Sequence, residues 1–433
     1  MKLSRYPEYT DSGVDWIGPV PSHWGIKRLK TLASQVTDKA TEKRRPVGLE
    51  NIEGWSGRFI STDADFQGDG VAFNAGDILF GKLRPYLAKV YLADSCGEAV
   101  GDFHVVRPLR MIEGRYLQYV MLSRSFIDIV DGSTFGSKMP RASWEALGGM
   151  PVAVPRPEEQ LSIATFLDRE TTKIDVVIAE QERLLELLAE KRQAAISHVV
   201  TMGLNPDAPT KNSGIDWFGQ VPAHWEVSQL RRVVLSFEQG WSPDCESRPA
   251  EGSEWGVLKA GCVNGGRFAE SENKALPPSL SPRQELMVNR GDLLMSRASG
   301  SPKLIGSVAV VEQVSSRLML SDKIFRLKVA PGFEPRFLAL VMGSFQLRQQ
   351  IEQSIGGAEG LANNLPQSRV KELWIPVPPQ SEQDLIVSEV DGVSRGIREL
   401  EAATEAVIAL LKERRSAMIS AAVTGQIDVR DVA

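Results

Sequence analysis

The chain has 433 residues, enough for two to four domains, and its apolar and charged fractions of 42% and 24% are those of a globular protein. No apolar run approaches the ~20 residues that span a bilayer, and the first residues lack the apolar core of a secretory signal. The formal net charge of −5 is unlike that of a basic nucleic-acid-binding domain, but in a multidomain chain the local clustering of Lys and Arg matters more.

Cysteine usage also narrows the possibilities. Cys96, Cys245 and Cys262 lie far apart in the sequence. Neither a disulfide framework nor a zinc cluster is therefore expected, and a reducing cytoplasm fits this composition.

The first recognisable segment of the chain occurs again later. Residues 12–24 read SGVDWIGPVPSHW and residues 213–225 read SGIDWFGQVPAHW, at an offset of 201 residues. The pair NAGDIL at 74–79 and NRGDLL at 289–294 follows at an offset of 215. The pattern V-P-x-x-x-E-Q-x-x-I at 154–163 returns at 377–386, and this offset of 223 then persists to Thr201 and Thr424. The chain is therefore a duplication, with about 22 extra loop residues in its second globular part.

Each globular part, 1–157 and 204–378, has the pattern of a mixed α/β domain. Short β-rich runs at 78–80, 89–92, 307–311 and 324–329 lie between Gly and Asn turns. A helical stretch is expected near 114–130 in the first part and near 334–353 in the second.

A long helix is expected after each globular part, at 158–203 and within 379–433. Pro157 with the acids that follow it, and Ser381 with Glu382, are helix-start signals. Residues spaced by seven form two seams: Ile174, Gln181, Leu188 and Ala195, with Val177 and Leu184 between them, and Ile397, Thr404, Leu411 and Met418, with Leu400 and Val407 between them. The seams predict an antiparallel coiled coil about 65 Å long that holds the globular parts apart, with two separate helical bundles as the alternative. The 12–24 segment is expected near the end of the second helix, closing a pseudo-two-fold arrangement.

Two motifs that could carry chemistry fit poorly. The run from Gly76 to Lys82 has P-loop spacing, but Leu83 stands where Ser or Thr would bind magnesium, and its interior has the pattern of a strand. The run Pro243-Asp244 with Glu272 and Lys274 loosely resembles a nuclease metal site and is missing from the first repeat.

The histidines give no better candidate. His23 and His224 are equivalent repeat positions beside Trp24 and Trp225, and this pairing favours packed structural residues over ligands. We expect no catalytic residue and no metal site in this chain.

Taken in order, these segments resemble the specificity subunits of type I restriction-modification systems. The 12–24 and 213–225 runs resemble their opening signature, and GDIL with KLRP at 82–85 resembles a strand of their target recognition domains. The two P-x-x-x-E-Q-x-x-I runs resemble the starts of their spacer helices, so the likeness spans essentially the whole chain. It implies two tandem α/β target recognition domains, 1–157 and 204–378, separated by spacer helices in 158–203 and 379–433.

The resemblance also implies a function. A non-catalytic subunit would bind double-stranded DNA, with each recognition domain reading one half of a bipartite asymmetric site. The helices would set the spacer length and dock two modification subunits, and restriction subunits would complete a cytoplasmic complex that has no membrane part. This chain would bind no cofactor, because S-adenosylmethionine, ATP and magnesium would belong to the partner subunits. The residues alone leave two alternatives: a stand-alone DNA-modifying or DNA-cleaving enzyme, and a helical scaffold that does not touch DNA.

Base reading needs long polar side chains on loops, chiefly Arg and Lys for guanine and Asn or Gln for adenine. The candidates in the two domains are Lys82, Arg84, Lys138, Arg141, Arg297, Lys303, Asn363 and Asn364. For each of them an ordinary surface charge or turn residue is the alternative. The expected helix positions for spacing and partner docking are Ile174, Leu184, Leu188, Ile397, Val407 and Leu411.

Overall fold

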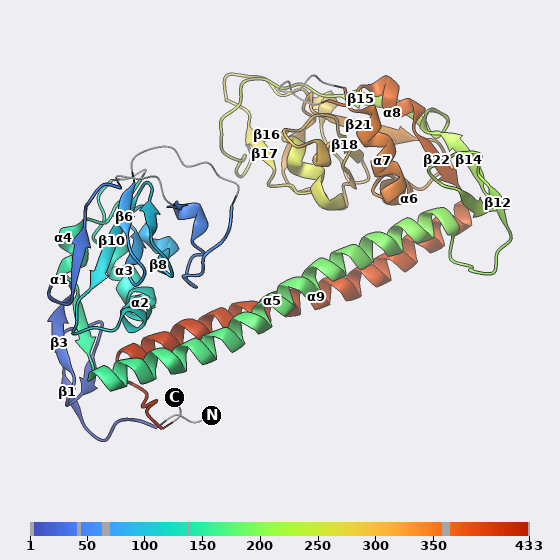
Figure 1. Cartoon of the computed structure of the whole chain (residues 1–433). Coiled ribbons are helices and arrows are strands. Elements are labelled where there is room, and N and C mark those ends of the chain that lie inside the picture. The colour runs from blue at the N-terminus through green and yellow to red at the C-terminus, as the bar shows by residue number, and fades with distance from the viewer. Residues whose placement is uncertain (1–3, 41–44, 63–69, 137–138, 357–363, 432–433) are drawn as a thin grey trace. The chain divides into compact units, whose positions relative to one another are not determined.

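The computed structural model describes residues 4–40, 45–62, 70–136, 139–356 and 364–431, and the chain divides into two compact units. The first unit is Met1–Arg183 with Thr404–Ala433, and the second is Leu184–Ala403. Each unit contains one sheet-rich domain and part of two long helices, α5 (Pro157–Met202) and α9 (Gln380–Val423) (Figure 1). Within the described ranges, none of the helices combines the length and apolar character needed to cross a bilayer.

The first domain is built on a four-stranded antiparallel sheet, β4 (Ala33–Val36), β10 (Phe103–Pro108), β7 (Ile78–Gly81) and β8 (Val90–Leu92), in that order. A smaller sheet contains β5 (Pro46–Val47), β9 (Gly97–Ala99) and β6 (Val71–Phe73). Two-stranded pairs join β1 (Tyr9–Asp11) to β2 (Pro19–Pro21) and β3 (Gly25–Arg28) to β11 (Pro151–Val154). The helices are α1 (Leu29–Leu32), α2 (Gly114–Leu122), α3 (Arg124–Gly132) and α4 (Trp144–Gly149).

The second domain repeats this plan. Its main sheet has the order β15 (Val234–Gln239), β21 (Ile324–Val329), β18 (Leu293–Ser296) and β19 (Val308–Val310). The smaller sheet contains β17 (Asn273–Ala275), β16 (Trp255–Leu258) and β20 (Arg317–Met319). Two-stranded pairs join β12 (Thr210–Asn212) to β13 (Gln220–Pro222) and β14 (Glu226–Gln229) to β22 (Trp374–Val377). The helices are α6 (Pro335–Met342), α7 (Phe345–Ser354) and α8 (Gln367–Glu372).

The expected helical stretch of each domain is present and consists of two helices. Ser123 between α2 and α3, and Ser344 before α7, have extended backbone conformations that interrupt the helix. Each serine hydroxyl donates to a carbonyl three residues earlier, Val120 or Val341, at 2.7 Å. Serine competes well for backbone hydrogen bonds outside helices, and this explains why a continuous apolar pattern is broken at the same place in both repeats.

The smaller sheets mark where the repeats diverge. In both domains the first strand runs parallel to the last, β5 with β9 and β16 with β20. The strand that comes second along the chain pairs differently in the two domains. In the first domain β6 pairs with the last strand, β9, whereas in the second domain β17 pairs with the first strand, β16. The offset between equivalent residues of the two repeats grows from 201 at the SGxDW motif to 215 at the Gly-Asp motif, so some of the extra residues of the second domain lie in this region.

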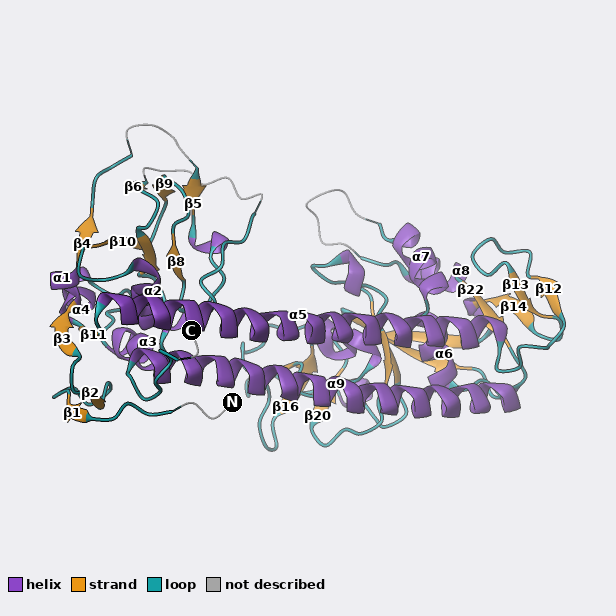
Figure 2. Cartoon of the chain, turned by 60° about the horizontal axis from the view of Figure 1, so that its bottom comes forward, coloured by secondary structure: helices purple, strands orange, loops and turns teal. Residues whose placement is uncertain are grey.

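The two long helices pack against each other in opposite directions. In the first unit, Ile163 and Leu167 near the start of α5 share a core with Ile419 near the end of α9. In the second unit, Val200 near the end of α5 shares a core with Ile386 near the start of α9. Figure 2 shows the two helices side by side. This confirms the expected antiparallel pair, whose members have 46 and 44 residues.

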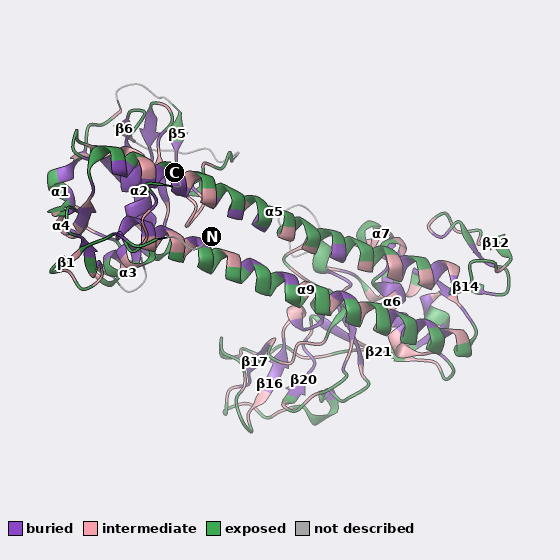
Figure 3. Ribbon diagram, turned by 90° about the horizontal axis from the view of Figure 1, so that it is seen from below, coloured by how far each residue is buried: buried purple, intermediate pink, exposed green. Residues whose placement is uncertain are grey.

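The prediction of which helix residues face the partner helix was correct for the positions spaced by seven and wrong for the positions between them. Ile174, Leu188, Ile397 and Thr404 are buried as expected, and Gln181 and Leu411 are half-buried. The positions placed between them, Val177, Leu184, Leu400 and Val407, are 39–55% exposed. The buried residues lie one step later, at Ile178 and Ile408. Figure 3 shows buried and exposed segments alternating along both helices. Apolar residues occupy both 177 and 178, so two stripes overlap and spacing alone could not choose between them.

The repeated P-x-H-W motif joins each domain to the start of its helix. His23 Nε2 lies 2.9 Å from Glu159 of α5, and the Trp24 indole N–H donates to the same carboxylate at 3.3 Å. In the second unit, Trp225 donates to Glu382 of α9 at 2.9 Å, and the His224 ring lies 2.6 Å from it. The histidines therefore have the structural role that the sequence favoured.

The glutamine that follows each of these acids anchors a second element. The Gln160 amide donates to the carbonyl of Pro155 at 2.9 Å and accepts from the Glu113 N–H, just before α2, at 2.7 Å. Gln383 makes the same pair of bonds to Pro378 and Glu334. Each E-Q pair thus holds together the start of the long helix, the strand before it and the earlier domain helix, α2 or α6.

The N-terminal arm closes the first unit at the end of α9. Gly425 has φ +72, and a Cβ there would lie 2.3 Å from Pro21 and 3.2 Å from the Trp24 ring. In the second unit, Gly203 after α5 has φ +74 and faces the ring of Trp225 in the same way. Only glycine fits this left-handed turn under an aromatic ring. The 12–24 segment therefore lies where the sequence predicted, at the end of the second helix.

Candidate nucleic-acid interface

In the first domain, three of the predicted base-reading residues come together at the end of β7. The backbone pairs two loops: the Ala142 N–H donates to the carbonyl of Lys82, and the Arg84 N–H donates to the carbonyl of Pro140, both at 2.9 Å. Leu83 and Arg141 form an isolated β-bridge. Lys82, Arg84 and Arg141 therefore share one surface, whereas Lys138 lies outside the described residues.

The charges on this surface are not equally available. Asp102 accepts from Arg141 at 3.0 and 3.1 Å, and the Lys82 ammonium lies 3.6 Å from it. Arg84 is exposed, has a left-handed backbone with φ 50, and makes no ion pair with any described residue. Arg84 is therefore the readiest hydrogen-bond donor here, while Asp102 holds the other two side chains in place.

A buried histidine supports the same loops from below. His104 Nε2 lies 2.9 Å from the Ala142 carbonyl, and Nδ1 lies 3.2 Å from the Gln35 amide nitrogen. Burial lowers the pKa of His104, and the nearby Lys82 charge acts in the same direction. The neutral ring can donate to one neighbour and accept from the other, so it fixes the loop next to Arg141.

The second domain has the same loop pairing with different side chains. The Leu365 N–H donates to the carbonyl of Arg297 at 2.8 Å, and Ala298 forms a β-bridge with Asn364. Arg297 therefore occupies the place of Lys82, and Asn364 that of Arg141. Asn363 lies outside the described residues.

The Arg297 side chain turns towards its own domain. Its Nη1 donates to the Asp322 carbonyl at 3.3 Å, and its guanidinium carbon lies 5.6 Å from the centre of the Phe325 ring. Its Nε is buried without a hydrogen-bond partner among the described residues. Lys303 is exposed on a short 3-10 turn, Pro302–Leu304, which Arg348 fixes to α7 through the Pro302 carbonyl.

Sequence reasoning missed the residues that set the charge of these loops. The Lys82 N–H donates to the carbonyl of Asp102, and the Arg297 N–H donates to that of Lys323, both at 2.9 Å. Lys323 therefore stands where the first domain has an acid. Neither Asp102 nor Lys323 belongs to a repeated motif. Each directly precedes a central strand, β10 or β21, so an alignment of those two strands could have identified them.

Another missed feature is the role of the Gly-Asp motif. Asp77 is buried and accepts two hydrogen bonds from Arg107 on β10, at 2.8 and 2.6 Å. Asp292 meets Arg326 on β21 at 3.0 Å. The motif therefore ties the end of one strand to the centre of the sheet. The P-loop interpretation is also ruled out by geometry, because Ile78–Gly81 is the strand β7.

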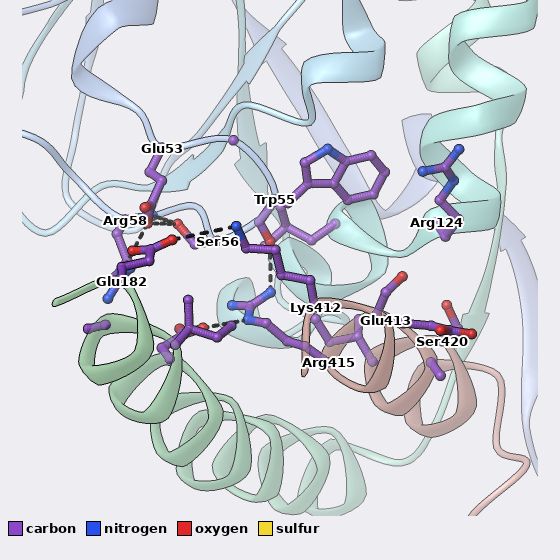
Figure 4. Close-up of a pocket in the computed structure, with 18 residues that line it drawn as sticks. Glu53, Trp55, Ser56, Arg58, Arg124, Glu182, Lys412, Glu413, Arg415 and Ser420 are labelled. Atoms are coloured by element: carbon purple, nitrogen blue, oxygen red, sulfur yellow. Dashed lines mark hydrogen bonds and ion pairs between the residues drawn. The ribbon is translucent and has the colours of Figure 1, made fainter. Parts of the chain in front are cut away.

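The first domain meets the helices at a cavity of about 760 Å³ within the first unit (Figure 4). Arg415 of α9 donates to Asp175 of α5 at 3.0 Å and to the carbonyl of Trp55 at 2.8 Å. The side chains of Arg415 and Asp175 are only 10% and 14% exposed. The guanidinium carbon of Arg124 lies 5.1 Å from the centre of the Trp55 ring. We call these contacts the Arg415 joint, which fixes the 53–58 loop to both helices.

The outer faces of the helices carry apolar side chains that the fold does not bury. Leu184 and Leu187 on α5, in the second unit, are 39% and 46% exposed. Val407 and Leu410 on α9, in the first unit, are 42% and 64% exposed. The second set follows the first at the constant offset of 223 residues. We call the two sets the α5 face and the α9 face.

Parts of the chain are similar in sequence to known proteins. The chain is 30% identical over 174 residues to the EcoEI type I restriction enzyme specificity subunit of Escherichia coli, covering 40% of this chain and 29% of that protein. It is 22% identical over 294 residues to the EcoKI specificity subunit of Escherichia coli strain K12, covering 66% of this chain and 60% of that protein.

Over the aligned residues the chain is similar to specificity subunits of type I restriction enzymes. The aligned part spans less than two thirds of either of these two relatives. No family model matches the chain.

A solved chain from a study of complex assembly and conformational transition in the type I R-M system has the same fold. It matches with a TM-score of 0.67 and 18% identity, over 93% of this chain and 98% of its own length. The likeness confirms two sheet-rich domains with long packed helices. Within the described part of the chain, no group of three or more His, Cys, Asp or Glu side chains has the arrangement of a metal site.

Proposed function

We propose that this chain is the DNA-recognition subunit of a type I restriction-modification complex and that it performs no catalytic step itself. Each domain reads one half of a bipartite, asymmetric DNA site, and the helices set the number of base pairs between the halves. Modification and restriction subunits supply the chemistry, so S-adenosylmethionine, ATP and magnesium bind to those partners. The relatives named above carry the specificity-subunit description, and the duplicated fold supports extending it to this chain.

The observation that carries the proposal is the shared backbone pairing of two recognition loops whose side chains differ. The same pairing of two loops follows β7 and β18, yet Lys82, Arg141 and Asp102 correspond to Arg297, Asn364 and Lys323. Side-chain donors and acceptors decide which base edge is read in the major groove. Two equivalent frames with different side chains are therefore suited to two different half-sites.

The decisive experiment is methylation mapping of DNA from cells that express this chain with its modification subunit. We expect one bipartite motif with two unlike halves. Exchanging residues 204–378 for the matching part of a relative should change only one half. A motif that changes in both halves would refute the assignment of one half-site to each domain. Methylation or cleavage by the purified chain alone would favour a stand-alone enzyme, and a lack of DNA binding with or without the partner would favour a scaffold.

The α5 and α9 faces are suited to docking two copies of one modification subunit. Two exposed apolar residues on each helix, repeated at a constant offset, offer two equivalent surfaces. Contiguous exposed apolar residues are typical of protein interfaces. Because equivalent surfaces bind equivalent partners, the duplication supports a stoichiometry of two.

Variants on one face at a time test this docking. Leu184→Glu with Leu187→Glu should reduce the complex from two modification subunits to one, and Val407→Glu with Leu410→Glu should do the same. The four substitutions together should abolish assembly, as measured by light scattering of the purified complex. Glu190→Lys, at an exposed polar position of α5, is the matched control. Unchanged stoichiometry in both double variants, with intact folding, would exclude these faces.

A further inference from the structure

A groove of about 760 Å³ opens beside the reading loop of the second domain. Three lysines line it, Lys259, Lys274 and Lys323, together with Ser242, Ser299 and Ser321. Among the described residues that line it, no side chain is acidic. The groove is therefore a pocket of positive charge and hydroxyl groups in a chain whose net charge is −5.

The lysines are largely free to meet a ligand. Lys259 lies 3.8 Å from Glu272, a long and exposed contact. Lys274 and Lys323 have no ion pair within the described residues. Exposed pairs at such distances contribute little, so a ligand anion can compete for Lys259.

A buried hydroxyl at the groove also lacks a partner. Ser321 is 2% exposed, and its Oγ makes no hydrogen bond to any described residue. Its neighbour Asp322 is occupied, because it accepts from the Ser242 hydroxyl and from the Gln239 amide through its carbonyl. A buried polar group without a partner is costly, and a bound acceptor would satisfy it.

The position of the groove links it to DNA reading. Ala298 and Ser299 line it directly after Arg297, and the Lys323 carbonyl accepts from the Arg297 N–H. Asp102, at the place of Lys323 in the first domain, pairs with Lys82 and Arg141. Lys259 and Lys274 lie where the second repeat has extra residues and a rearranged small sheet.

We propose that this groove binds the phosphodiester backbone of DNA beside the half-site that the second domain reads. The three ammonium groups and the hydroxyls of Ser299 and Ser321 donate to phosphate oxygens, which are acceptors only. The inference rests on the proposed DNA-recognition function, and the experiment below separates the two.

Salt dependence of binding is the direct test, because each phosphate contact contributes about 0.9 to the slope of log K against log salt. The full chain in complex with its modification subunit is titrated with its mapped target duplex and with a scrambled duplex at 50–200 mM salt. Changing Lys259, Lys274 and Lys323 to Gln should lower the slope by up to about 2.7. Affinity for both duplexes should fall by the same factor, and the mapped methylation motif should stay the same. Lys211→Gln, at an exposed position on β12 outside the groove, should leave the slope unchanged.

The other outcomes are equally clear. If the wild-type complex binds neither duplex, the proposed function fails. If it binds both and the triple variant keeps its slope, the groove proposal fails while the function stands. Saturable binding of free ATP that the triple variant loses, with an unchanged DNA slope, would assign the groove to a nucleotide instead. A changed methylation motif would make these lysines base readers and overturn the backbone role.

Discussion

Replacing Arg415 by Met should loosen the joint between the first domain and its helices. The guanidinium of Arg415 bonds to Asp175 of α5 and to the Trp55 carbonyl, and both charged side chains are nearly buried. Methionine keeps the length and apolar bulk of the side chain but leaves the Asp175 carboxylate and the carbonyl without their donor. Removing one member of a buried ion pair costs about 3–5 kcal/mol. The adjacent cavity gives water a route to Asp175, so we expect the low end, about 3 kcal/mol.

A chain of two units does not unfold in one step, so the assay must resolve regions. Native-state hydrogen exchange of the amides in 404–423 reports opening of the first unit, and the amides in 385–400 provide an internal reference. A loss of 3 kcal/mol raises the opening equilibrium about 150-fold. The exposed neighbour Arg414→Met is the matched control and should change exchange by less than threefold.

The double variant Arg415→Met with Asp175→Leu distinguishes a joint from a simple packing site. Replacing both charges by apolar groups removes the unpaired carboxylate, so exchange should return to within about tenfold of the wild type. The reasoning is refuted if the single variant exchanges like the control. It is also refuted if the double variant is as destabilised as the sum of the two single variants.

Three further predictions concern other parts of the frame. Glu159→Gln should destabilise the first unit by about 1–2 kcal/mol, because the Glu159 side chain is only 5% exposed. Glu382→Gln should destabilise the second unit by less, because the Glu382 side chain is 34% exposed. Regional hydrogen exchange should show each effect in one unit only. Burial lowers the folded pKa of His104, so its contribution to stability is present above the ordinary pKa near 6.5 and is lost as pH falls below it. The unfolding midpoint should therefore drop between pH 7.5 and 5, and the drop should shrink in His104→Gln. An equal drop in the wild type and the variant would exclude His104 as its source. Inserting seven residues into both α5 and α9 lengthens each helix by about 10 Å, so the mapped motif should gain about three base pairs of spacer; an unchanged spacer would refute the measuring role.

The sequence repeat predicted much of the fold, because equivalent residues of the two repeats make equivalent contacts. The P-x-H-W and E-Q motifs meet through Glu159 and Glu382, which are 136 and 158 positions from His23 and His224. Sequence showed that both motifs mattered, but nothing in either one indicated that they touch. The helix seam failed for a different reason: Val177 and Ile178 are both apolar, and only packing decides which is buried. Single-residue exposure is a tertiary property that helix periodicity cannot fix.

The recognition loops were the hardest part to predict. Lys82, Arg84 and Arg141 were chosen for their side-chain chemistry, and the structure brings them together, but Asp102 beside them carried no signal of its own. Arg297 had the same signal as Lys82, yet its guanidinium packs on Phe325. The residue beside Lys82 is Asp102 and the residue beside Arg297 is Lys323, and these pairings appear only when β7 meets β10 and β18 meets β21.

The two domains show how one frame can serve two readings. Contacts that hold the frame, such as Asp77 with Arg107 and Asp292 with Arg326, join an acid directly before one central strand to an arginine inside the neighbouring strand, where backbone hydrogen bonds fix the register. The residues that differ, Asp102 against Lys323, lie where those strands end and the ladder no longer constrains the side chain. A substitution there changes the charge offered to a ligand without disturbing a buried pair, so it costs little stability. Recognition can therefore diverge at the strand ends while the helices, with their constant offset, keep the same length.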